Sequence, residues 1–203
     1  MPKNLSPADI ADFRERLLDA AERLFAEHGA EAVTIRQLAE AIGVSPMTPY
    51  RYFKDKDAIL AAARARAFDR HADALEQAYE ASDGRDPLAR SEVVGTAYVR
   101  FALENPEAYK LMFDTKQPNA WEYADLKRAG ERSRATMTQH LRDMAAAGIL
   151  KGDPDLIGHL YWSAVHGPLM LHFSGLLLPE YGALTLIERL TDAVTLLIRE
   201  GAA

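Results

Sequence analysis

The sequence has no cysteine, which excludes disulfide bonds, thiolate metal sites and cysteine nucleophiles among its 203 residues. It also lacks any apolar run near the roughly eighteen residues of a membrane span, because His, Ser or charged residues interrupt its apolar stretches. Residues 1–10 are polar and acidic and do not resemble a secretory signal. With 48% hydrophobic and 27% charged residues, the composition is that of an ordinary globular protein, and we expect a cytoplasmic location without membrane partners.

A surplus of positive charge is missing as well. The net charge is −6, and residues 1–57 carry eight Lys and Arg against ten Asp and Glu. Such a balance disfavours indiscriminate attraction to nucleic acid. A specific DNA contact needs only a few cations on one face. The first 57 residues still supply four cations near a single motif, namely Arg36, Arg51, Lys54 and Lys56.

The sequence also has little that would support catalysis. Its six histidines are scattered, and only His159 and His166, seven residues apart, would share one face of a helix. No carboxylate in that segment completes a metal triad with them. There is no phosphate-binding glycine loop and no nucleophile elbow. We therefore expect no enzymatic activity, no metal and no cofactor.

Apolar residues recur at the spacing of α-helices along most of the chain. Between residues 8 and 28, apolar side chains recur every three or four positions, with Pro7 before them and Gly29 after them. No convincing strand alternation is found. The pattern predicts an all-α protein of about nine helices, with a three-helix domain at 1–56 followed by a helical bundle at 57–203. The further helical segments are expected at about 57–81, 87–104, 107–113, 121–147, 154–178 and 184–200.

Residues 34–53 predict a helix-turn-helix. Thr34 and Gln37 have the spacing of a capping box at the start of a short helix, and Gly43 can adopt the positive φ needed to leave it. Ser45 would cap a second helix, with Pro46 at its first position. In DNA-binding proteins the second helix of this unit enters the major groove. A helical adaptor whose helix-turn-helix contacts protein is the alternative.

The same block resembles the tetracycline-repressor (TetR) family of bacterial regulators. The matching residues run from Ala32-Val33-Thr34-Ile35 through Gly43-Val44-Ser45 and Tyr50-Arg51-Tyr52-Phe53 to Lys56-Asp57-Ala58-Ile59-Leu60. Residues 105–113, and Trp162 with His166-Gly167, resemble the effector-binding domain of one TetR subgroup. The resemblance implies a transcriptional regulator, most often a repressor, that leaves its operator when a small molecule binds.

The resemblance also implies roles for individual residues. Thr34 and Lys56 would stand at helix N-termini that meet phosphates, and the hydroxyls of Tyr50 and Tyr52 would flank the DNA backbone. One residue departs from the family pattern: Pro49 replaces a leucine-like residue and removes a helical hydrogen bond to the Ser45 carbonyl. The expected DNA-contacting set is Thr34, Arg36, Ser45, Pro46, Met47, Thr48, Tyr50, Arg51, Tyr52 and Lys56.

An effector pocket is expected in the second domain. Pro168 should kink its helix beside Trp162 and His166, and adaptable apolar side chains in the middle of the chain could form the other walls. Each of these residues could instead be part of the core. The effector would be largely apolar, and the candidate lining is Tyr109, Met112, Phe113, Met137, His140, Met144, Trp162 and His166.

A homodimer is expected because one helix-turn-helix reads only a few base pairs. The last helix carries a narrow apolar seam, and the helix before it offers small residues that permit close approach. Both helices could instead be simple core elements. The expected interface is Ser163, Gly167, Leu171, Ser174, Ile187, Leu190, Val194 and Leu197.

Overall fold

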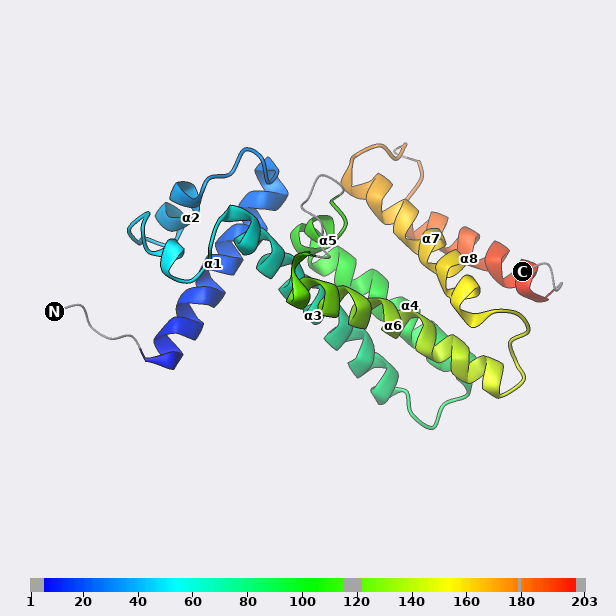
Figure 1. Ribbon diagram of the computed structural model, residues 1–203. Coiled ribbons are helices and arrows are strands. Elements are labelled where there is room, and N and C mark those ends of the chain that lie inside the picture. Colours follow the sequence, from blue (N-terminus) through cyan, green and yellow to red (C-terminus); the bar gives the residue numbers. More distant parts are fainter. Residues whose placement is uncertain (1–5, 115–121, 179, 200–203) are drawn as a thin grey trace. The chain divides into compact units, whose positions relative to one another are not determined.

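The computed structural model describes residues 6–114, 122–178 and 180–199, which are helical with connecting turns and contain no strand (Figure 1). The all-α expectation is thus confirmed. Trp121, expected at the start of a helix, lies outside the described residues. The elements are α1 (Pro7–His28), α2 (Ile35–Ala41), the 3₁₀ helix η1 (Pro49–Arg51), α3 (Lys56–Ala81), α4 (Pro87–Glu104), α5 (Pro106–Met112), α6 (Ala124–Ala146), α7 (Pro154–Phe173) and α8 (Ala183–Arg199).

The chain forms two compact units that are not simply consecutive in sequence. Residues 1–69 and 107–130 make the first unit, and residues 70–106 and 131–203 make the second. The continuous helix α3 contributes to both, as does α6. This division differs from the boundary expected after residue 56. The reason lies in packing, since Leu111 of α5 belongs to the hydrophobic core of the first unit.

The first unit has a core built on α1. This helix begins with a capping box, in which the Ser6 hydroxyl accepts a hydrogen bond from the Asp9 amide, and it ends at Gly29. Its apolar face buries Leu17 completely against Leu38 of α2 and Ile59 of α3, which are also fully buried. Burial of such side chains contributes about 1.5–3 kcal/mol each, which fixes α2 and the following turn against α1.

The second unit contains a smaller core around Leu141, Met144 and Ile157, where α6 meets α7. The helices approach closely at Gly158, because a Cβ at that position would lie 2.7 Å from the Thr138 Cγ2 atom. The helix α7 also packs against α8 (Figure 1) and continues through the buried Pro168. Among the described helices, none combines the length and apolarity that a bilayer crossing requires.

Candidate nucleic-acid interface and ligand cavity

The first half of the helix-turn-helix forms as the sequence predicts. The Thr34 hydroxyl accepts a hydrogen bond from the Gln37 amide at 3.3 Å, and the Gln37 side chain accepts from the Thr34 amide at 2.8 Å. Gly43 leaves the helix with φ of 70°. The Val44 amide then donates to the Ala39 carbonyl at 3.0 Å, and the Val44 side chain packs against the first unit's core. The capping box and the glycine turn are therefore confirmed.

The second half differs from a regular α-helix. The Thr48 amide donates to the Ser45 carbonyl at 2.8 Å, and the Arg51 amide donates to the Thr48 carbonyl at 3.1 Å. Both bonds span three residues, the spacing of a 3₁₀ helix. The cause is Pro49, which has no N–H to give the Ser45 carbonyl a four-residue bond. The expected second helix is therefore a turn followed by η1, and Pro49, the first residue of η1, is buried.

This tight winding presents a small group of side chains to solvent. Met47 is 69% exposed and Tyr50 is 51% exposed, and Ser45, Pro46 and Arg51 are exposed beside them. Met47 lies in the turn before η1, and Tyr50 and Arg51 lie in η1 itself. We call Pro46, Met47, Tyr50 and Arg51 the reading face.

Three other residues expected to contact DNA are partly buried or already paired within the protein. The ring of Tyr52 is half-buried and lies 4.6 Å from the ring of Phe13, and Thr48 is also half-buried. Arg36 is exposed but pairs with Glu40 at 2.8 Å, and this hydrogen bond raises the pKa of the Arg36 guanidinium. Thr48 and Tyr52 are thus less accessible to DNA than the reading face, and Arg36 is less available to DNA because it is paired with Glu40.

Lys56 forms hydrogen bonds within the first unit. Its Nζ donates to the Ala30 carbonyl at 2.6 Å and to the Glu31 carbonyl at 3.3 Å, so it ties the start of α3 to the loop after α1. The resemblance implies that Lys56 stands at a helix N-terminus that meets a phosphate. In the structure its donors are directed at backbone carbonyls that follow the α1 C-terminus.

Lys56→Met should lower the free energy of unfolding by about 1–2 kcal/mol, because two carbonyls lose a charged hydrogen-bond donor. Chemical denaturation followed by circular dichroism measures this. Lys54→Met, at an exposed neighbouring position, is the matched control and should leave the unfolding midpoint unchanged. Equal midpoints for the two variants would show that the Lys56 contacts contribute nothing to stability.

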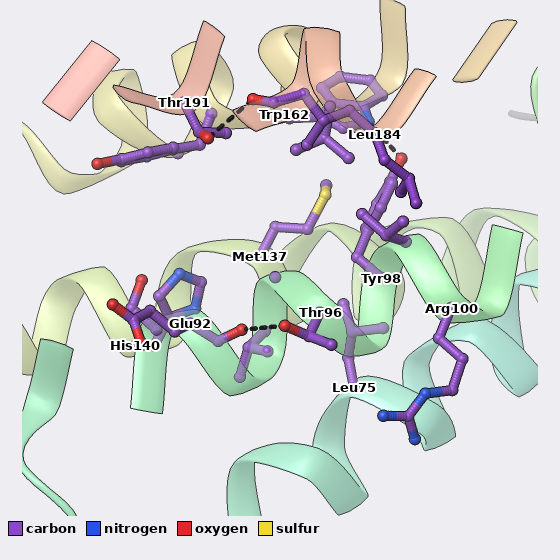
Figure 2. A pocket seen from close by; sticks show the side chains of 18 of the residues that line it. Leu75, Glu92, Thr96, Tyr98, Arg100, Met137, His140, Trp162, Leu184 and Thr191 are labelled. Atoms are coloured by element: carbon purple, nitrogen blue, oxygen red, sulfur yellow. Dashed lines mark hydrogen bonds between the residues drawn. The ribbon is translucent and has the colours of Figure 1, made fainter. Parts of the chain in front are cut away.

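A cavity of about 930 Å³ lies within the second unit (Figure 2). It is lined by side chains from α4, α6, α7 and α8, together with Leu75 of α3. Figure 2 shows Met137 of α6 extending toward the space between the helices. The volume falls in the range of pockets that hold small molecules, and aliphatic and aromatic residues form most of the wall.

Hydrogen bonds within the wall hold its aromatic residues in place. The Trp162 indole N–H donates to the Tyr98 hydroxyl at 3.0 Å (Figure 2). The Tyr161 hydroxyl lies 2.7 Å from the Thr195 hydroxyl, which itself donates to the Thr191 carbonyl. The polar ends of three cavity aromatics are thus engaged with other wall groups, and this arrangement defines the shape of the wall.

Only some of the residues expected to form an effector pocket line the cavity. Met137, His140 and Trp162 line the cavity. His166 is half-buried with its ring 5.6 Å from that of Trp162, and burial lowers its pKa, but it is not part of the lining. Four others do not line the cavity either. Met144 packs in the core of the second unit, whereas Tyr109, Met112 and Phe113 belong to the first unit.

Much of the lining was not anticipated from the sequence. Tyr98, Val94 and Val99 of α4, and Leu184 and Thr191 of α8, all contribute. The signal available was the apolar face of residues 87–104, in which Val94, Tyr98 and Phe101 recur at helical spacing. That spacing identifies a face directed inward without showing whether the face meets a core or a cavity.

The residues expected at a dimer interface differ in exposure, and only some of them are available to a partner. Leu171 is 41% exposed and Leu190 is 43% exposed, and Ser163 and Ser174 are exposed as well. Gly167 and Val194 are half-buried. Ile187 is buried and lines the cavity, so one edge of the expected seam faces inward. The Leu197 side chain lies outside the described residues.

The first unit thus contains a helix-turn-helix with an exposed group of side chains, and the second unit contains a cavity of small-molecule size. Residues 17–63 match the family model for bacterial regulatory proteins of the tetR family, and residues 91–194 match the tetracyclin repressor-like C-terminal domain. The chain belongs to the TetR family of transcriptional regulators.

Individual relatives agree with this assignment. The chain is 31% identical to the HTH-type transcriptional repressor Rv1474c of Mycobacterium tuberculosis over 75% of its own length and 76% of that protein. It is 33% identical to the repressor KstR of Rhodococcus jostii over 58% of its own length, which spans 51% of KstR. A solved structure of a protein of unknown function from Rhodococcus sp. RHA1 is 29% identical, covers 98% of both chains and has a TM-score of 0.75. The fatty acid degradation regulator FadR from Bacillus halodurans shares the fold, with a TM-score of 0.73 at 15% identity over 95% of this chain and 96% of that one.

Proposed function

We propose that this TetR-family regulator is a repressor that binds operator DNA as a homodimer and is released by a small molecule. The observation that carries the proposal is the reading face, a set of exposed side chains on a turn that Pro49 and the first unit's core hold in place. The relatives named as HTH-type transcriptional repressors support the direction of regulation. No catalytic step is part of this function.

The cavity of the second unit is the proposed effector site. Its mostly apolar wall suits a largely apolar molecule, and Trp162, which belongs to the subgroup resemblance together with His166-Gly167, is part of that wall. Binding there would change operator affinity only to the extent that the effector prefers the DNA-incompetent arrangement. The effector must therefore bind free protein more tightly than operator-bound protein.

Arg51 should be the residue of the reading face that discriminates bases. Its guanidinium is exposed with Cζ 5.8 Å from the centre of the Tyr52 ring, a contact that helps to orient it. Arg51→Ala should weaken operator binding by about 1–3 kcal/mol and relax the preference at one base pair, because arginine binds guanine through two hydrogen bonds. Arg36→Ala, which removes an exposed cation already paired with Glu40, is the control and should change affinity less.

Two properties can be tested together: binding to operator DNA and base discrimination by Arg51. Bound fragments are selected from random DNA and then titrated by anisotropy at several salt concentrations. Operator affinity of the unmodified protein should fall steeply as salt rises. A uniform loss for Arg51→Ala on all sequences would make Arg51 a phosphate contact. Failure to recover any salt-sensitive DNA ligand would favour the helical-adaptor alternative.

A further inference from the structure

Carboxylates predominate among the charged residues that line the cavity. Glu92 and Glu104 of α4 and Asp192 of α8 contribute three negative charges. Arg100 of α4 is the one cation among the lining residues that the structure describes. All four are exposed, as expected for groups at the solvent side of a cavity. A bound anion would therefore meet a rim whose net charge is negative.

Among the lining residues that the structure describes, those in the interior supply no positive charge to offset this rim. His140 is 9% exposed and lines the cavity, and its Nδ1 atom has no hydrogen-bond partner. Burial lowers the pKa of His140 to about 4, so the ring is neutral at physiological pH. A neutral imidazole can form a hydrogen bond with a ligand, but it does not neutralise a carboxylate or a phosphate.

The hydroxyl groups of the wall present oxygen atoms more than hydrogen-bond donors. Thr96, Thr191 and Thr195 each donate to a carbonyl in the preceding turn of their own helix, at 2.8 Å in every case. The oxygen of Thr195 also accepts from the Tyr161 hydroxyl, whereas those of Thr96 and Thr191 are left as acceptors, which suits a ligand that donates hydrogen bonds or carries positive charge. A carboxylate ligand would need donors instead.

The aromatic residues of the wall fit the same class of ligand. Tyr98, Tyr161 and Trp162 have their polar atoms engaged within the wall, so their rings provide much of the remaining contact surface. The faces of such rings attract cations, and a desolvated ammonium group gains most from them. Aliphatic side chains such as Leu75 and Met137 supply an apolar surface for the remainder of the molecule (Figure 2).

We propose that the effector is a hydrophobic cation, with an apolar body held in the cavity and a protonated amine or quaternary ammonium group attracted by the rim carboxylates. This inference rests on the proposed function, since it takes the cavity as the effector site. It separates this chain from regulators whose effectors are anionic, because the same carboxylates repel a negatively charged head group.

Three decyl probes that differ only in head group test the proposal on the full-length protein: decyltrimethylammonium, decanol and decanoate. The two ionic probes are titrated below their critical micelle concentrations and decanol below its solubility limit, and binding is followed by calorimetry. The ammonium compound should bind on the order of tenfold more tightly than the alcohol, because exposed carboxylates each contribute modestly. Decanoate should bind most weakly. Equal affinity for the three probes, or tightest binding of decanoate, would overturn the proposal.

Variants locate the source of the preference. The isosteric double variant Glu92→Gln with Asp192→Asn should lose most of the preference for the ammonium probe and retain its affinity for decanol. Glu188→Gln, an exposed position on α8 outside the lining, is the matched control and should retain the preference. Met137→Trp places a larger side chain in the cavity and should abolish binding of all three probes. Binding of the ammonium compound that survives Met137→Trp would show that it binds elsewhere and would overturn the proposal.

An operator-release assay separates this inference from the function on which it rests. Release of operator DNA by decanoate, with no release by the ammonium probe, would refute the cationic effector and leave the effector-controlled repressor standing. Tight binding of the ammonium probe in the cavity without operator release would support the cation preference of the site and refute the proposed mechanism of release.

Discussion

Acidification from about pH 7 to pH 4 should remove several kcal/mol from the free energy of unfolding, because two buried histidines of the second unit must then bind protons on unfolding. Burial lowers the pKa of His71 to about 4 and that of His140 to about 4, compared with 6.5 for an ordinary histidine. His71 is 1% exposed, and its Nδ1 lies 2.9 Å from the Ser133 hydroxyl while its Nε2 has no partner. Protonation would place a charge on a ring that water cannot reach.

The sign of the pH dependence follows from the direction of the shift. Between about pH 6.5 and pH 4 the unfolded chain binds these protons and the folded chain does not, so stability falls as the pH falls. The stabilisation is fully present above pH 6.5 and is lost near pH 4, and each histidine contributes about 3 kcal/mol to the difference. A total of this size is comparable to the whole stability of a typical domain, so unfolding within this window is expected.

Urea denaturation at closely spaced pH values measures the effect. His71→Phe should remove about half of the pH dependence, because an apolar ring can occupy the place between Tyr98 and Phe101, whose ring centres lie 4.9 and 5.1 Å from that of His71. His172→Gln, at an exposed position, is the control and should leave the pH dependence unchanged. An unaltered slope in the His71→Phe variant would show that this histidine is not the group that titrates.

The features predicted correctly from the sequence are those encoded locally. The N-terminal boundary of α1 at Pro7 and both boundaries of α4 fall where expected, because proline, a capping side chain and a glycine or asparagine act on the residues beside them. The Thr34 capping box and the Gly43 turn were predictable for the same reason. Pro49 was recognisable as a source of distortion, whereas its burial depends on contacts with the core.

The cavity was much harder to predict, because its lining depends on which helix faces meet across the fold. Tyr109 and Met112 have the apolar character expected of a pocket, but α5 carries them into the first unit. Tyr98 and Thr191 come from helices far apart in the sequence and line the cavity because α4 and α8 bring them to it. Periodicity assigns a residue to an inward face and does not identify the partner of that face.

Leu190→Arg should convert a dimeric repressor into a monomer that has lost most of its operator affinity. Leu190 is 43% exposed on α8, and Leu171 is 41% exposed on α7, the helix that packs against it. Apolar surface of this kind marks an interaction site, and a buried, unpaired arginine would strongly oppose association. Because each subunit of the proposed homodimer would read one half-site, loss of the second subunit should weaken operator binding on the order of a hundredfold or more.

Sedimentation velocity and operator titration of the same preparations test this prediction. Ile149→Arg introduces an identical charge at a 52% exposed apolar position outside α7 and α8, so it should remain dimeric and bind DNA normally. A Leu190→Arg protein that stays dimeric would place the interface on another surface. A monomeric Leu190→Arg protein with undiminished operator affinity would show that dimerisation is not needed for recognition. Loss of both properties in Leu190→Arg alone would establish that this face of α8 joins the two reading faces into one operator-binding unit.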